Sequence, residues 1–147
     1  MLPKQEHTGL LISAARRRIK QVVLDRVQAH GLSPSQFWMV VALSEHPGCS
    51  LRQLAGQLRL DDPTASRVLA ALARAGHVHM EQDPDDRRRL RARLSSSGKA
   101  LARKLVPIAT EVRGTVDSAL EARERETLRA LLIKVITHID RARGLEL

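Results

Sequence analysis

An arginine-rich segment from Asp83 to Leu94 constrains the fold of this chain more than any other stretch. Its first four residues, DPDD, favour a tight reversal of the backbone. From Leu90 onward, apolar residues alternate with arginines, which is the two-residue period of a strand with one solvated face. The segment therefore predicts a β-hairpin whose guanidinium groups suit an anionic partner better than a hydrophobic core.

Four helices are expected before this hairpin, the first of them at about residues 10–30, where apolar residues recur at helical spacing. Ser33 and Ser50 are each followed three residues later by glutamine, the pattern of a capping box, so a helix is expected after each. A fourth helix should begin at Asp62 and end at Gly76. A helix-turn-helix followed by an arginine-rich hairpin predicts a winged-helix DNA-binding fold.

Two more helices are expected after the hairpin, a long one opened by Ser95–Gly98 and kinked at Pro107, and one from about 123 to 143. The first helix and these two have long apolar stripes that a small winged domain cannot cover alone. Packing against the same helices of a second chain would bury them, so a two-fold homodimer is expected.

The predicted fold class is mainly α with a small β-hairpin wing, a winged helix-turn-helix with N- and C-terminal dimerisation helices. The expected parts are a single domain over 1–147, a DNA-binding part over 33–94, and dimerisation helices over 8–30 and 95–147.

The charge of the chain is uneven. The formal net charge is +9 for 147 residues, which favours a polyanionic partner. Residues 50–104 hold twelve bases and six acids, whereas residues 105–147 carry equal numbers of each. The excess therefore lies around the expected helix-turn-helix and wing. The absence of a signal-peptide core, of a membrane-length apolar run and of any cysteine besides Cys49 leads us to expect a cytoplasmic protein without a membrane partner.

The helix order and two sequence motifs resemble the MarR family of bacterial transcription regulators. The motifs are the wing DPDDRR at 83–88 with LSSSGKAL at 94–101 after it, and DDPTASR at 61–67. The resemblance covers nearly the whole chain. It implies a homodimeric winged helix-turn-helix repressor whose affinity for a palindromic operator on double-stranded DNA falls when a small ligand binds.

Candidate DNA contacts follow from the helix-turn-helix and from the resemblance. The first residues of the fourth helix should face base edges in the major groove, and Arg67 can pair with guanine through two hydrogen bonds. Thr64 either contacts DNA or caps the helix. The resemblance implies that Arg88 enters the minor groove, while Asp86 is expected to orient an arginine. The full set is Arg52, Gln53, Asp62, Pro63, Thr64, Ser66, Arg67, Asp86, Arg87, Arg88, Arg89 and Arg91.

The resemblance places an effector pocket between the dimer helices and the winged part, and it implies a small aromatic carboxylate as effector. His7 and Thr8 are candidates to close over the site, Arg16 and Arg18 to reach the carboxylate, and Trp38 to stack on the ring. The alternatives are a solvated basic face for the arginines and dimer core for the tryptophan. The stretch from residue 7 to residue 21 is similar to the nicotinate-catabolism regulators of the family, which implies 6-hydroxynicotinate.

Other classes of function have weaker support in the sequence. Cys49 could serve a redox-responsive regulator, although a structural role for this small residue is favoured. His77 and His79 share a strand face, but two ligands are too few for a metal, and no metal or other cofactor is expected. No phosphate loop, zinc motif or nucleophile elbow points to an enzyme. An architectural DNA-binding protein without a ligand is the main rival.

Overall fold

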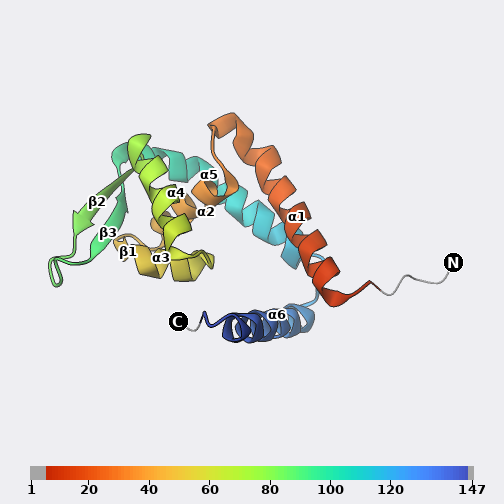
Figure 1. Ribbon diagram of the computed structural model, residues 1–147. Coiled ribbons are helices and arrows are strands. Elements are labelled where there is room, and N and C mark those ends of the chain that lie inside the picture. The colour runs from red at the N-terminus through yellow and green to blue at the C-terminus, as the bar shows by residue number, and fades with distance from the viewer. Residues whose placement is uncertain (1–5, 146–147) are drawn as a thin grey trace. The chain divides into compact units, whose positions relative to one another are not determined.

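The computed structural model describes residues 6–145, which are mostly helical (Figure 1). No helix in this range is long and apolar enough to cross a membrane. The helices are α1 (Thr8–Val27), the 3-10 turn η1 (Gln28–His30), α2 (Pro34–Glu45), α3 (Leu51–Leu58), α4 (Asp62–Arg74), α5 (Ser96–Asp117) and α6 (Ala122–Ala142), and the strands are β1 (Cys49–Ser50), β2 (Val78–Gln82) and β3 (Leu90–Leu94).

The chain divides into two compact units, Met1–Val112 and Arg113–Leu147. The first unit holds α1 to α4, the sheet and most of α5, and so includes the whole segment 33–94 expected to bind DNA. The second holds the end of α5 and α6, where Arg129 Nη2 lies 3.4 Å from Asp117 Oδ2. The predicted fold class, mainly α with a small wing, is confirmed.

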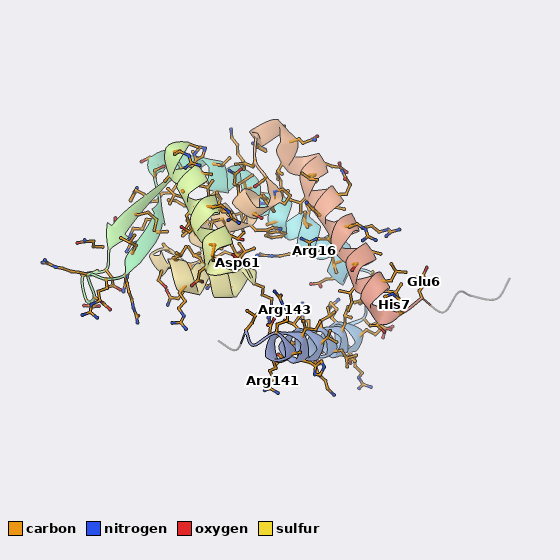
Figure 2. All side chains as sticks on the ribbon, in the orientation of Figure 1. Glu6, His7, Arg16, Asp61, Arg141 and Arg143 are labelled. Atoms are coloured by element: carbon orange, nitrogen blue, oxygen red, sulfur yellow. The ribbon has the colours of Figure 1, made fainter. Side chains whose placement is uncertain are left out.

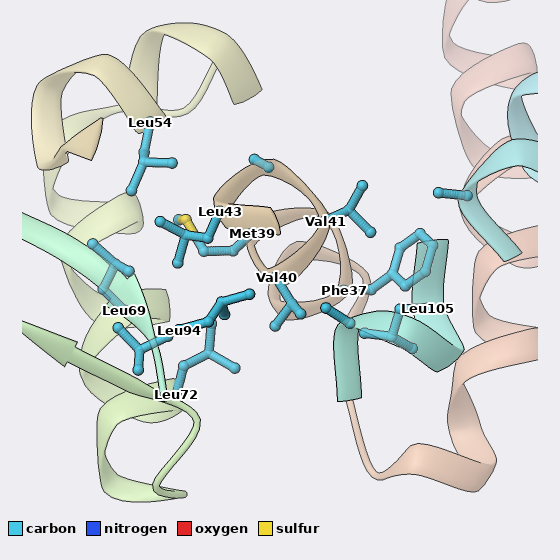
Figure 3. Packing of buried hydrophobic residues seen from close by; sticks show 14 of the residues in the cluster. Phe37, Met39, Val40, Val41, Leu43, Leu54, Leu69, Leu72, Leu94 and Leu105 are labelled. Carbon is cyan, nitrogen blue, oxygen red and sulfur yellow. The ribbon is translucent and has the colours of Figure 1, made fainter. Parts of the chain in front are cut away.

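The core of the first unit is built around α2. Phe37, Met39 and Val40 are fully buried on this helix. Figure 3 shows α2 between Leu105 of α5 on one side and the leucines of α3, α4 and β3 on the other. Because α2 is covered on several sides, its apolar residues need no single stripe.

Local capping signals fix where α2 and α3 begin, as predicted. Ser33 Oγ accepts from the Gln36 N–H at 3.2 Å, and Gln36 Oε1 accepts from the Ser33 N–H at 2.9 Å. Ser50 and Gln53 repeat this reciprocal pair with the same two distances. Each box satisfies N–H groups that the first helical turn would otherwise leave without a partner.

The sheet has the order β1-β3-β2 and is antiparallel throughout. Strand β1, which the sequence pattern did not predict, pairs Cys49 with Ala92. On β3, Ala92 and Leu94 are buried as the alternation predicts, but Leu90 is 48% exposed. Only the half of β3 nearest the helices therefore buries its apolar side chains.

The start of α5 is held tightly against the short segment that joins α4 to β2. Ser95 Oγ donates to the Gly76 carbonyl at 2.6 Å, and the Ser95 N–H donates to the His77 carbonyl at 3.0 Å. A Cβ atom at Gly98 would lie 2.0 Å from that same carbonyl oxygen, so any larger residue would force the backbone to shift. Farther along, α5 continues through Pro107, so the kink expected there does not interrupt the helix.

The outer helices expose much of their apolar surface. On α1, Val23 and Val27 are buried, but Ile19 is exposed, so the inward stripe covers mainly the last turns. Helix α6 has no buried residue within the chain. Its exposed large side chains are Leu128, Leu131, Ile133, Val135 and Ile139.

Candidate nucleic-acid interface

Helix α4 begins at a hydrogen-bonded chain of three side chains. Asp61, labelled in Figure 2, is the N-cap, and its Oδ1 accepts from the Thr64 N–H at 2.8 Å. Thr64 Oγ1 donates to Asp61 Oδ2 at 2.9 Å and accepts from Arg67 Nη2 at 3.2 Å. The Thr64 N–H and hydroxyl hold the pKa of Asp61 below its ordinary value. Thr64 thus helps to cap the helix and holds one guanidinium nitrogen of Arg67.

A hollow of about 770 Å³ lies between α3, α4 and the hairpin. Its lining includes the exposed Ser66 on α4 and Arg52 at the start of α3, with the hairpin arginines opposite. Seven of the twelve predicted DNA-contact residues line this one hollow, namely Arg52, Gln53, Asp62, Ser66, Arg88, Arg89 and Arg91. The other five, Pro63, Thr64, Arg67, Asp86 and Arg87, are not among its lining residues.

The base of the hairpin loop, where β2 and β3 meet the turn, is held by a buried carboxylate. Asp83 is 7% exposed, and its Oδ2 lies 3.0 Å from Arg91 Nε. Asp83 Oδ1 accepts from the Asp85 N–H at 2.9 Å. That N–H and then the Arg91 guanidinium hold the pKa of Asp83 below its ordinary value. Arg91, predicted as a phosphate contact, therefore has a structural partner already.

The tip of the hairpin differs from its base. Asp86 accepts from the Arg88 N–H at 3.1 Å, and its Oδ2 lies 3.6 Å from Arg89 Nε. Within residues 6–145, the guanidinium groups of Arg87 and Arg88 have no carboxylate partner, and both residues are exposed. Asp86 therefore contacts the backbone of the turn and one neighbouring arginine, whereas Arg87 and Arg88 have no carboxylate partner in the described residues.

Gln53 has fewer side-chain groups left for a contact with DNA than the sequence suggested. Its side-chain oxygen accepts from the Ser50 N–H, so only its amide hydrogens are left for a phosphate. Arg52, its neighbour in the first turn of α3, is exposed. Backbone N–H groups at a helix start favour anions, and Arg52 adds a full positive charge there.

Four of the five residues predicted for the effector pocket lie on α1 or at its N-cap, and the fifth, Trp38, lies on α2. His7 Nδ1 accepts from the Leu10 N–H at 3.2 Å and so caps α1 at the residue before Thr8. Figure 2 shows His7 at the start of α1 and Arg16 farther along the helix. Arg16 and Arg18 are two residues apart, so they point to different sides of the helix. Trp38 is half-buried on α2, with its ring 4.7 Å from that of Phe37.

The residues considered for redox or metal chemistry have structural surroundings. Cys49 is half-buried in β1, and burial raises the pKa of its thiol, which disfavours the reactive thiolate. His77 lies outside β2, and its Nδ1 is 2.8 Å from Ser97 Oγ, so it does not share a strand face with His79 as expected. Among residues 6–145, no three metal-ligating side chains converge.

Comparison with known proteins decides the family. The MarR family model matches residues 32–90. The HTH-type transcriptional regulator YkoM of Bacillus subtilis is 30% identical over 109 residues, which is 74% of this chain and 71% of YkoM. This chain belongs to the MarR family.

Two further MarR relatives cover nearly the whole chain. The HTH-type transcriptional repressor NicR of Pseudomonas putida is 28% identical over 137 residues, or 93% of this chain and 87% of NicR. A solved structure of BpsR from Bordetella bronchiseptica, described as regulated in its DNA binding by 6-hydroxynicotinic acid, is 26% identical with a TM-score of 0.76. The match covers 92% of this chain and 96% of BpsR. As a MarR protein, the chain is a DNA-binding transcriptional regulator and not an enzyme.

Two acids of this surface, Asp61 and Asp83, connect to arginines in ways that the sequence analysis does not predict. Both lie within the motifs described above. The spacing of three residues from Asp61 to Thr64 is a capping signal that could have identified the first. Nothing in the local sequence shows that Asp83 is the buried acid among Asp83, Asp85 and Asp86.

Proposed function

We propose that this MarR protein is a homodimeric repressor that binds a palindromic operator and is released by a small aromatic carboxylate, 6-hydroxynicotinate being the first candidate. The observation that carries the DNA-binding part is the shared hollow beside α4, where residues from α3, α4 and the hairpin present their side chains together. Its size and basic rim suit a nucleic-acid backbone passing between a helix and a wing.

The contacts divide by chemistry. Ser66 and Arg67 are proposed to contact base edges from α4, with Asp62 and Pro63 beside them at its first turn. Arg88 is proposed to enter the minor groove, where narrow DNA concentrates negative potential. Arg87 and Arg52 are proposed to contact phosphates, with Gln53, Arg89 and Arg91 as weaker contributors because each already has an intramolecular partner.

The homodimer is supported by the apolar side chains that the single chain leaves exposed. Helix α6 exposes Leu131 and Ile139 at 55% and 48%, and α1 exposes Leu11 at 50%. Burying such surfaces against a second copy is favourable by roughly 25 cal/mol per Å² of apolar area. The effector pocket is proposed at the junction of these helices with the winged part, with His7, Thr8, Arg16, Arg18 and Trp38 as its candidate residues.

The effector class is supported by the names of the relatives, a repressor called NicR and a BpsR structure described with 6-hydroxynicotinic acid. Cys49 is a weaker basis for regulation because burial raises the pKa of its thiol.

The test is a mobility-shift titration with DNA from upstream of the gene, with and without 6-hydroxynicotinate. We expect tight, sequence-selective binding that the carboxylate weakens and the uncharged 6-hydroxynicotinamide does not. Selective binding that no aromatic carboxylate changes would favour the architectural protein instead. A monomer in solution scattering at the working concentration would contradict the homodimer.

A further inference from the structure

A second hollow, of about 780 Å³, lies in the first unit between the end of α2, the two hairpin strands and the first half of α5. It shares no lining residue with the hollow beside α4. On β2 it is lined by His79, whereas the other hollow is lined by Met80. Successive side chains of a strand point to opposite faces, so the two hollows reach β2 from opposite sides.

The lining of this second hollow is cationic. It contains the side chains of Arg93, Lys99 and Arg103, and no aspartate or glutamate; His79 also lines it. The remaining lining is largely apolar and includes buried side chains of the core, so charged groups surround an apolar surface. These apolar lining residues are Leu43, Pro47, Leu94, Ala102, Val106 and Pro107.

Lys99 and Arg103 are the cations that the fold leaves without compensation. They lie four residues apart on α5, on one face of the helix, where two like charges destabilise it. Both are exposed, and within residues 6–145 neither side chain has a carboxylate partner. A bound anion would remove this repulsion.

Arg93 is held at the edge of the same hollow. Its Nε lies 3.0 Å from Glu81 Oε2, and Glu81 Oε1 is 3.5 Å from His79 Nε2. The guanidinium also lies against Gly48, where a Cβ atom would be 3.0 Å from Nη2 and where φ is +78°. Because the carboxylate of Glu81 pairs with Arg93, it leaves the charges of Lys99 and Arg103 unbalanced.

We propose that this hollow binds a small organic anion, a carboxylate joined to an apolar ring, with the carboxylate at Lys99 and Arg103 and the ring against Val106 and Pro107. The volume lies within the range of small-molecule sites, and an apolar surface with a few charged groups is their usual composition. The site is separate from the effector pocket proposed above, and its ligand binding does not depend on that pocket. Arg93 and Leu94 of β3 line the same hollow, so the bound anion would lie between the long helix and the hairpin.

The experiment measures binding of 2-naphthoate by calorimetry to the full chain and to a K99A/R103A variant. We expect saturable binding to the parent protein and an affinity lower by roughly tenfold or more in the variant, because the charge-assisted hydrogen bonds to the carboxylate are removed. Both residues are exposed and repel each other, so the thermal midpoint of unfolding should not fall. Uncharged 2-naphthamide should bind much more weakly than 2-naphthoate.

Two matched controls locate the site. Lys104→Ala removes one charge from an exposed residue of α5 that does not line the hollow, and it should leave the affinity within about twofold. Arg16→Ala removes a charge from the effector pocket proposed on α1, so an affinity that is lost only in this variant would place 2-naphthoate in that pocket instead. The proposal is overturned if the parent protein shows no saturable binding, if K99A/R103A binds as well as the parent, or if only Arg16→Ala loses affinity. Operator binding is measured separately, so failure of the ligand site leaves the DNA-binding function untouched.

Discussion

The tip and the base of the hairpin use the same residue type in opposite ways. At the base, Arg91 is paired with the buried Asp83, and Arg93 is paired with Glu81. At the tip, Arg87 and Arg88 have no carboxylate within residues 6–145. An arginine that is already paired stabilises the protein, whereas an unpaired one retains its charge and its hydrogen-bond donors for DNA. The arginine run therefore contains paired residues that hold the hairpin and unpaired residues that are proposed to contact DNA.

The largest effect is expected at the tip. Arg88→Ala should lower operator affinity by about tenfold to a hundredfold, since a specific contact to DNA contributes about 1–3 kcal/mol. The thermal midpoint should stay unchanged because Arg88 has no intramolecular side-chain partner in the described chain. Mobility-shift titration and thermal unfolding measure the two quantities, with Arg17→Ala on α1 as the matched removal of one charge. Equal binding by Arg88→Ala and the parent would refute the role of the tip.

A smaller effect, on stability rather than on DNA binding, is expected at the base. Asp83→Asn and Arg91→Ala should each lower the thermal midpoint by a few degrees, because each leaves its partner unpaired. The double variant should lose much less than the sum of the two single changes. Additive losses in this double-mutant cycle would show that the pair does not hold the hairpin.

The salt dependence of operator affinity should differ between variants of the two regions, because the tip and the base are expected to neutralise different numbers of phosphates. Removing one neutralised phosphate should reduce the slope of log affinity against log salt by about 0.9. We expect that reduction for Arg87→Ala at the tip and a smaller one for Arg91→Ala at the base, where Asp83 already balances the charge. Identical slopes for both variants would remove the distinction between tip and base.

The smallest effect is an acid sensitivity. The pKa values of Asp61 and Asp83 are lowered in the folded protein from an ordinary value of 3.8. Their stabilisation is therefore fully present above about pH 4 and is lost as the pH falls through the lowered values. Thermal midpoints measured from pH 6 downward should decline less steeply for Asp83→Asn than for the parent. Parallel declines would assign the acid sensitivity to other groups.

Much of the fold could be predicted because its signals are local. The serine–glutamine boxes at Ser33 and Ser50 act over three residues, and α2 and α3 begin directly after those serines. The alternation along β3 also predicts a strand without any knowledge of its neighbours.

The features that the sequence did not predict depend on residues that are far apart in the chain or on a second copy of it. Strand β1 is two residues long and is defined only by its pairing with β3. The ion-pair partners of Arg91 and Arg93 depend on which residues the hairpin brings together. Glu81 stands opposite Arg91 in the register, but its carboxylate pairs with the diagonal neighbour Arg93. The apolar stripe of α6 has the pattern of a core-facing helix, but none of the residues of α6 is buried in the described structure.

The close approach at Gly98 has a mechanical consequence. The helix backbone there touches the His77 carbonyl directly, and Ser95 fastens the same corner to Gly76 and His77. No side chain lies between the two backbones to absorb a displacement. A rotation of the first turn of α5 would therefore displace the backbone at His77, the residue that directly precedes β2.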